Sequence, residues 1–161
     1  MAYLQRMVDG LLTELLESSG AVLIEGPKWC GKTTTATQQA ASILRLQNPD
    51  TREAYIATAK TKPSLLLKGE TPRLIDEWQI IPQLWDAVRV MVDDRNEMGQ
   101  FILTGSNSID NQDIMHSGTG RIARLRMQPM SLFETQESTG EISLKALFEN
   151  PNMDIDAITS Q

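Results

Sequence analysis

Residues 21–36 read AVLIEGPKWCGKTTTA, and the prediction of the fold rests on them. Ala21–Ile24 is an unbroken apolar run, which suits a strand that is buried on both faces. Gly26 to Thr33 then matches the pattern G-x-x-x-x-G-K-[ST] at every specified position. A helical spacing of apolar residues begins at Thr33. A phosphate-binding loop requires this order of strand, glycine-rich loop and helix, so the sequence predicts such a loop here.

The chemistry of this loop comes from its backbone and from two side chains. Glycines let the chain turn tightly, so that successive N–H groups point at phosphate oxygens, and the helix N-terminus adds partial positive charge. Lys32 is predicted to reach the β- and γ-phosphates of a nucleotide, and Thr33 to place its hydroxyl on Mg²⁺. The predicted nucleotide-binding residues are Gly26, Pro27, Lys28, Trp29, Cys30, Gly31, Lys32, Thr33 and Thr34.

A pair of acids follows the short apolar strand candidate Arg73–Asp76. We predict that Asp76 binds Mg²⁺ and that Glu77 activates the attacking water. The alternative is an ordinary strand end with solvated acids, but the phosphate loop upstream favours the functional interpretation.

Three further candidates lie in the second half of the chain. Thr104 and Ser106 follow the apolar run Phe101–Leu103, and the carboxyl ends of parallel strands line the ligand crevice. Either hydroxyl is a candidate to orient water or to contact the γ-phosphate, with a turn-forming Thr-Gly-Ser as the alternative. Arg121 follows a glycine-containing stretch and is the candidate for stabilising charge on the transferred phosphate, with a solvated surface arginine as the alternative.

Strand candidates alternate with helical patterns along the chain. This alternation predicts an α/β fold with a mostly parallel sheet, and together with the phosphate loop it predicts a three-layer P-loop NTPase fold with a roughly five-stranded sheet and helices on both faces. We expect 1–148 to form one domain that starts with an amphipathic helix, and the acidic segment 149–161 to be a tail or the start of a linker. The expected helices are about 2–18, 33–46 and 82–97, and the expected strands are about 21–24, 53–57, 73–76, 101–103 and 122–127.

Composition narrows the classes of function. The 161 residues are enough for one core, and 15 Lys and Arg against 21 Asp and Glu give a net charge of −6, which disfavours nucleic-acid binding by bulk charge. A single cysteine, Cys30, excludes an internal disulfide, and with one histidine it leaves no ligand set for a structural zinc. No apolar stretch reaches the ~20 residues of a membrane span and the N-terminus lacks a secretory apolar region, so we expect a soluble cytoplasmic protein without a membrane partner.

At these motifs the chain resembles the AAA-type P-loop ATPases, and more narrowly the archaeal and bacterial ATP-binding proteins that carry a second domain after the ATPase core. The chain looks like their N-terminal ATPase domain alone. The resemblance implies ATP rather than GTP, permits a homo-oligomer, and implies that another strand separates the strand of Asp76 from that of the phosphate loop. The resembling stretches are GPKWCGKTTTA (26–36), RLIDEWQIIPQLWDAVR (73–89), FILTGSNS (101–108) and GTGRIARLRMQPMSLFE (118–134).

The resemblance also implies a role for each candidate side chain. These roles are phosphate binding and catalysis for Lys32, magnesium binding for Thr33 and Asp76, general base for Glu77, sensor for Thr104 or Ser106, and arginine finger for Arg121.

Three functions fit these residues. The leading one is an Mg²⁺-dependent ATPase that hydrolyses ATP to ADP and phosphate and drives or switches an attached domain or protein partner; Glu77 and Arg121 favour hydrolysis over binding alone. A small-molecule P-loop kinase would use the same Lys32 and Thr33, but no arginine-rich lid segment follows the fourth strand candidate. A nucleotide-gated interaction module with negligible turnover is the third.

Overall fold

The structure is a computed structural model, and it describes residues 2–106, 118, 120–140 and 142–151. Contacts divide the chain into two compact units, one of Val8–Pro129 and one that combines Met1–Met7 with Met130–Gln161. The division into a domain of 1–148 and a tail of 149–161 stays a prediction. No helix of the described ranges is both long and apolar enough to cross a membrane.

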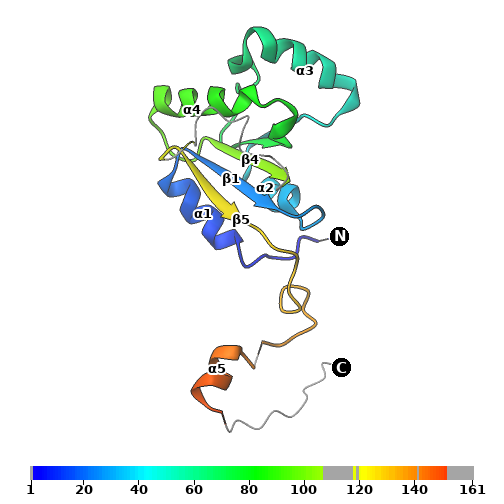
Figure 1. Cartoon of the computed structure of the whole chain (residues 1–161), viewed down its shortest axis with the longest axis vertical. Coiled ribbons are helices and arrows are strands. Elements are labelled where there is room, and N and C mark those ends of the chain that lie inside the picture. Colours follow the sequence, from blue (N-terminus) through cyan, green and yellow to red (C-terminus); the bar gives the residue numbers. More distant parts are fainter. Residues whose placement is uncertain (1, 107–117, 119, 141, 152–161) are drawn as a thin grey trace. The chain divides into compact units, whose positions relative to one another are not determined.

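A five-stranded sheet forms the centre of the Val8–Pro129 unit (Figure 1). Its order is β2-β3-β4-β1-β5, and every neighbouring pair is parallel. Because β4 lies between β1 and β3, the separation implied by the family resemblance is confirmed. The strands are β1 (Ala21–Gly26), β2 (Ser42–Arg45), β3 (Arg73–Asp76), β4 (Phe101–Ser106) and β5 (Ile122–Arg126).

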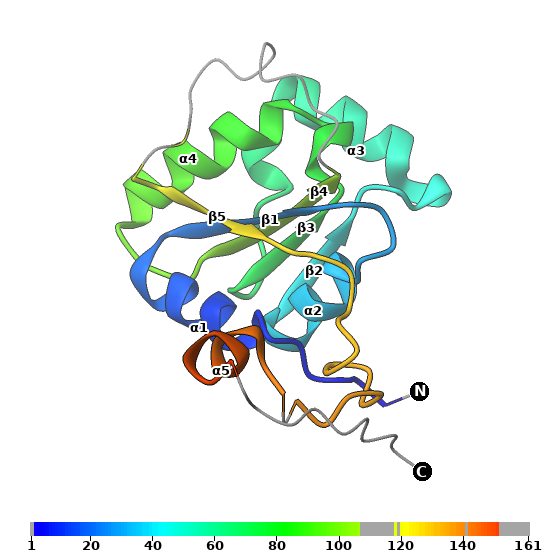
Figure 2. The same ribbon diagram turned by 60° about the horizontal axis from the view of Figure 1, so that its bottom comes forward.

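Helices cover both faces of this sheet, as Figure 2 shows. Successive residues of β1 point to opposite faces: Leu23 packs in a buried cluster with α4, whereas Ile24 packs in a second cluster with α1 and α2. A strand buried on both faces is continuously apolar, as predicted. The three-layer α/β fold is therefore confirmed. The helices are α1 (Asp9–Ser18) and α2 (Lys32–Gln39) on one face, and α3 (Pro49–Thr61) and α4 (Gln83–Arg95) on the other, with short 3₁₀ turns η1 (Pro63–Leu65) and η2 (Trp78–Ile80).

The second strand of the sheet was predicted at the wrong place. The helix expected over 33–46 ends at Gln39, and Ser42–Arg45 forms β2, paired with β3. Ile43 and Leu44 pack on opposite faces of the sheet, and two adjacent apolar residues fit a buried strand as well as a helix. Periodicity alone therefore could not separate the two structures.

The strand predicted over 53–57 is also wrong, because these residues lie inside α3. Pro49 occupies the first turn, where a missing N–H costs nothing, and the Asn48 side chain accepts a hydrogen bond from the Asp50 N–H at 3.1 Å. These start signals outweigh the short apolar run. The other predicted helices are confirmed with shorter bounds, since α1 begins at Asp9 rather than residue 2 and α4 ends at Arg95.

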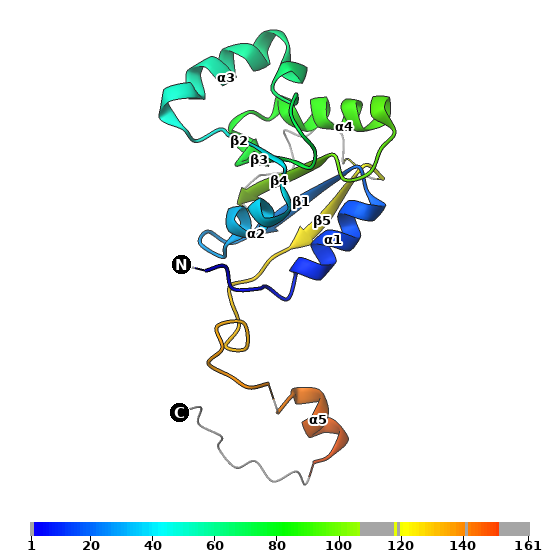
Figure 3. The same ribbon diagram turned by 180° about the vertical axis from the view of Figure 1, so that it is seen from behind.

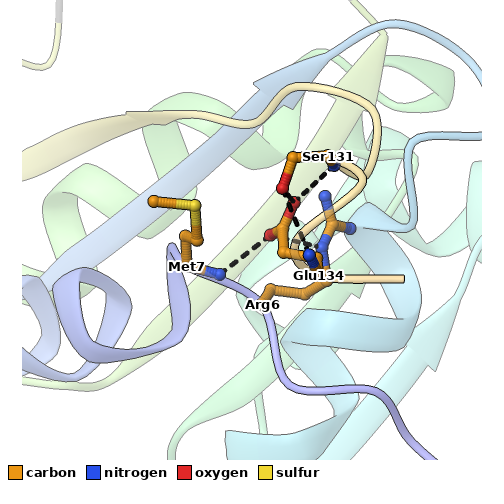
Figure 4. A network of polar contacts seen from close by, with 4 residues as sticks. All are labelled: Arg6, Met7, Ser131 and Glu134. Carbon is orange, nitrogen blue, oxygen red and sulfur yellow. Dashed lines mark hydrogen bonds and ion pairs between the residues drawn. The ribbon is translucent and has the colours of Figure 1, made fainter. Parts of the chain in front are cut away.

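In the second unit, the carboxylate of Glu134 joins two segments that are far apart in sequence (Figure 4). It accepts hydrogen bonds from Arg6 Nε at 2.9 Å, from the Met7 N–H at 2.8 Å, and from the N–H and hydroxyl of Ser131 at 2.7 and 2.9 Å. The side chains of Arg6 and Glu134 are only 5% and 7% exposed. This unit also contains α5 (Leu144–Glu149).

We expect Glu134→Gln to loosen this unit at neutral pH. The Ser131 N–H, the Met7 N–H and Arg6 stabilise the charged carboxylate, and together they outweigh burial and lower the pKa of Glu134 from 4.5 to about 2. The stabilisation is therefore complete above about pH 4.5 and is lost as the pH falls toward 2. At pH 6 the variant replaces a charged acceptor by a neutral one, so the free energy of the local opening that exposes the Met7 and Ser131 amides to exchange should fall by about 2 kcal/mol.

Amide hydrogen exchange at Met7 and Ser131 measures this effect locally. Wild type and variant should differ less at pH 3 than at pH 6. Glu137→Gln, an exposed acid three residues further on, is the control and should change neither amide. Equal protection of the two amides in Glu134→Gln and wild type at pH 6 would contradict the assignment.

Candidate nucleotide-binding and catalytic site

The predicted phosphate loop joins the end of β1 to the start of α2 (Figure 3). Both glycines of the motif are required by their surroundings. A Cβ at Gly26 would lie 2.3 Å from the Met127 carbonyl oxygen, and Gly31, which precedes the first residue of α2, has a left-handed φ of 96°. Trp29 between them also has a positive φ, 68°. The backbone of the loop is therefore tightly curled over the N-terminus of α2.

Lys32 is the first residue of α2, and its side chain folds back into the loop. It is only 6% exposed, and its ammonium donates to the carbonyls of Gly26 at 3.0 Å and Pro27 at 2.8 Å. A lysine ammonium has three donors, and two of them contact the loop itself. A cation is therefore held where the loop curls, next to the helix N-terminus.

The Asp76 carboxylate connects three elements at the carboxyl end of the sheet. Its Oδ1 accepts hydrogen bonds from the hydroxyl of Thr33 on α2 and from that of Thr104 on β4, each at 2.7 Å. Both Asp76 and Thr104 are buried. The contact with Thr104 follows from the strand order, because β4 lies next to β3. The structure thus brings together Thr33 and Asp76, the two predicted magnesium ligands.

Glu77 comes directly after β3 and lines a pocket. Its backbone is left-handed (φ 57°, ψ 51°), which is uncommon for a residue with a side chain, and its N–H donates to the Thr104 hydroxyl at 3.3 Å. The pocket has a volume of about 460 Å³. It is lined by Lys28, Trp29, Gly31, Lys32, Thr33, Thr34, Gln47 and Glu77.

Comparison with known proteins agrees with this geometry. The family described as AAA domain matches residues 18–136, which is more than half of the chain. The chain belongs to the AAA domain family. It is similar to the uncharacterized protein Mb2031c of Mycobacterium bovis and the uncharacterized protein Rv2008c of Mycobacterium tuberculosis, each 29% identical over 132 residues. The match covers 81% of this chain and 30% of each relative, so the chain spans about a third of their length.

The resemblance to AAA-type P-loop ATPases is thus confirmed, and the chain is a nucleotide-binding, P-loop ATPase-like domain. An additional C-terminal domain stays a prediction. The pocket includes one residue that sequence reasoning missed, Gln47. Gln47 follows β2, and a correct assignment of that strand would have found it, because the carboxyl ends of parallel strands line the ligand crevice.

Two loop residues contribute to the AAA domain in different ways. The Cys30 side chain is buried in the apolar cluster below the loop and does not line the pocket. The Trp29 side chain is 99% exposed and does line it.

Of the two sensor candidates, Thr104 contacts Asp76, and the backbone of Ser106 pairs with Gly26. The Ser106 side chain lies outside the described part of the chain.

The structure does not bring Arg121 to the phosphate loop. Arg121 precedes β5, whose first residue, Ile122, pairs with Ala21 at the start of β1, whereas the phosphate loop follows the end of β1. A strand of five residues spans about 16 Å. Arg121 Nε lies 2.8 Å from Asp93 Oδ1, and this hydrogen bond raises the pKa of Arg121. Within one chain, Arg121 therefore lies at the amino ends of the strands, whereas the phosphate loop lies at their carboxyl ends.

We expect Thr104→Val to destabilise the AAA domain. Valine has nearly the same shape but no hydroxyl, so the Glu77 N–H loses its acceptor and Asp76 loses a buried donor. The free energy of unfolding should fall by about 1–3 kcal/mol, as is typical when buried polar groups lose a partner. Urea unfolding measures the change, and Thr104→Ser, which keeps the hydroxyl, should lose less. Equal losses in the two variants would show that the hydroxyl does not matter.

Proposed function

We propose that this AAA domain is an Mg²⁺-dependent ATPase that hydrolyses ATP to ADP and phosphate. The observation that carries the proposal is the Asp76 carboxylate, hydrogen-bonded to the hydroxyls of Thr33 and Thr104 directly beside Glu77. A loop that only bound phosphate would need Lys32 and its own backbone. A carboxylate, a second acid and a polar strand end beside that loop are the groups that phosphoryl transfer to water requires.

The residues present fit a magnesium ion. Mg²⁺ prefers oxygen ligands and is usually held by one or two carboxylates together with substrate phosphates, rather than by a cage of protein ligands. Asp76 supplies a carboxylate and Thr33 a hydroxyl, and the two oxygens lie 2.7 Å apart. Thr33 and Asp76 would hold the ion, which when bound would supply positive charge against the phosphates of the nucleotide.

The remaining chemistry belongs to Lys32 and Glu77. We propose that the Lys32 ammonium exchanges the carbonyls of Gly26 and Pro27 for phosphate oxygens when ATP binds. The Glu77 carboxylate then accepts a proton from water as the water oxygen bonds to the γ-phosphorus. The bond between the γ-phosphorus and the bridging oxygen breaks, and ADP leaves with that electron pair.

We further propose that the cycle drives or switches an attached domain or protein partner in the cytoplasm. The longer relatives support the attached domain, because the chain spans 30% of their length. Arg121 lies far from the loop of its own chain, so a role as an arginine finger requires a second copy of the chain, and we propose a homo-oligomer for that role.

Phosphate release from ATP tests the proposed reaction. It should require Mg²⁺, stop with a chelator, and proceed without any added acceptor. Small molecules with hydroxyl groups are added in parallel. Release or transfer only in their presence would indicate the kinase, and tight ATP binding without release would indicate the nucleotide-gated module.

A further inference from the structure

Gln79 contacts the proposed general base. It lies in η2, two residues after Glu77, and its Nε2 donates a hydrogen bond to Glu77 Oε2. The opposite orientation of the amide would turn its oxygen toward the carboxylate, and two acceptors repel each other. The contact therefore fixes which way the amide points.

The other end of the same amide faces β4. Gln79 Oε1 is buried and has no hydrogen-bond partner in the part of the chain that the structure describes. A Cβ at Gly105 would lie 2.9 Å from this oxygen, so the amide packs directly against the strand residue that follows Thr104. A buried acceptor without a partner costs about 1–3 kcal/mol, and such a cost in a native structure calls for an explanation.

The turn that carries Gln79 is firmly held. Trp78 is buried and packs against Trp85 with ring centroids 4.9 Å apart. The Ile80 N–H donates to the Glu77 carbonyl at 3.0 Å, which closes the turn over the left-handed Glu77. Gln79 is therefore presented to Glu77 by a rigid element rather than by a loose loop.

We propose that Gln79 is a positioning residue for ATP hydrolysis, which fixes the carboxylate of Glu77 for proton transfer and links its orientation to the end of β4. This inference rests on the proposed function. A glutamate side chain on a pocket wall has several rotamers, and a general base works only when its oxygen lies within about 2.6–3.2 Å of the water oxygen whose proton it accepts. The hydrogen bond from Gln79 selects one of these rotamers. The benefit to catalysis would explain why the buried Gln79 oxygen is kept without a partner, despite its cost in folding free energy.

Gln79→Leu tests the proposal, since leucine keeps most of the volume and removes both polar atoms. The kcat for phosphate release should fall about 10-fold, because a misplaced catalytic group loses rate steeply with position. The KM and the Kd for ATP should stay within about twofold, because Gln79 does not line the pocket. The melting temperature should not fall, because the variant also removes a buried acceptor that lacks a partner.

A second variant tests the contact itself. Gln79→Glu has nearly the same size but sets a like charge against Glu77, so its kcat should fall further than that of Gln79→Leu. Gln83→Leu, an exposed glutamine at the start of α4, is the matched control and should behave as wild type.

The outcomes separate the two proposals. Unchanged kcat in both Gln79 variants of an active domain would overturn the positioning role alone. A lower melting temperature with equal losses in kcat and ATP affinity would assign Gln79 a structural role and would also overturn it. No phosphate release from the wild-type chain would overturn the ATPase and this inference together.

Discussion

Lys32→Ala should weaken ATP binding about 10²–10⁴-fold and lower phosphate release with it. The Lys32 ammonium is held inside the phosphate loop, on the carbonyls of Gly26 and Pro27, so it needs only a small movement to reach bound phosphate. Alanine removes the only buried cation of the loop among the described residues. Hydrogen bonds between charged groups contribute about 1.5–3 kcal/mol each. The loss of two such bonds corresponds to an affinity about 10²–10⁴-fold lower.

Titration of wild type and variant with ATP and Mg²⁺ measures this loss directly. Lys60→Ala removes an exposed lysine from the last turn of α3 and serves as the control for the change in net charge. The control should bind ATP as wild type does. Binding by Lys32→Ala within a few-fold of wild type would mean that the loop does not hold phosphate.

Glu77→Gln should separate binding from chemistry. The amide has nearly the same shape and still accepts a hydrogen bond from Gln79 through its carbonyl oxygen, but it cannot take a proton from water. Turnover should therefore fall about 10²–10⁴-fold, the usual contribution of a general base. The affinity for ATP should remain, because Lys32 and Thr33 are unchanged. Phosphate release and ATP titration on the same sample measure the two quantities.

Glu53→Gln provides the matched control, an exposed acid on α3 with the same change of charge. It should leave both quantities as in wild type. Turnover of Glu77→Gln close to that of wild type would mean that another group activates the water, whereas a loss of ATP affinity would assign Glu77 to binding.

The phosphate loop could be predicted because its geometry depends on residues close together in sequence. The Thr33–Asp76 pair could be predicted because every parallel α/β sheet brings the carboxyl ends of its strands together. The glycine pattern sets the backbone within eight residues. Asp76 is the last residue of an apolar strand, and in a parallel sheet the carboxyl ends of all strands lie on the same side. What residue spacing could not give was the order of the strands, since pairing between β1, β4 and β3 depends on contacts far apart in sequence. The family resemblance implies only that one strand separates the strand of Asp76 from that of the phosphate loop, and the structure shows that this strand is β4.

The missed features depend on tertiary contacts. Ile43 and Leu44 fit a helix and a strand equally well, and they form a strand because their segment pairs with β3. Gln79 contacts Glu77 across a turn in which Glu77 has a left-handed backbone. A positive φ is uncommon for a glutamate, so the sequence does not predict this turn. The position of Arg121 relative to the phosphate loop depends on the direction of β5, which spacing along the chain does not give.

The position of β5 at the side of the sheet also has a consequence for association between chains. In the described sheet β5 pairs with β1 alone, so its other side is an open edge. Exposed edges invite strands of other molecules, and charged side chains on them oppose such pairing. Arg124 and Arg126 are the exposed residues of this strand, and Arg124 is held by Glu25 at 2.7 Å. These two arginines therefore place positive charge along the open edge, and such charge opposes pairing with strands of other molecules.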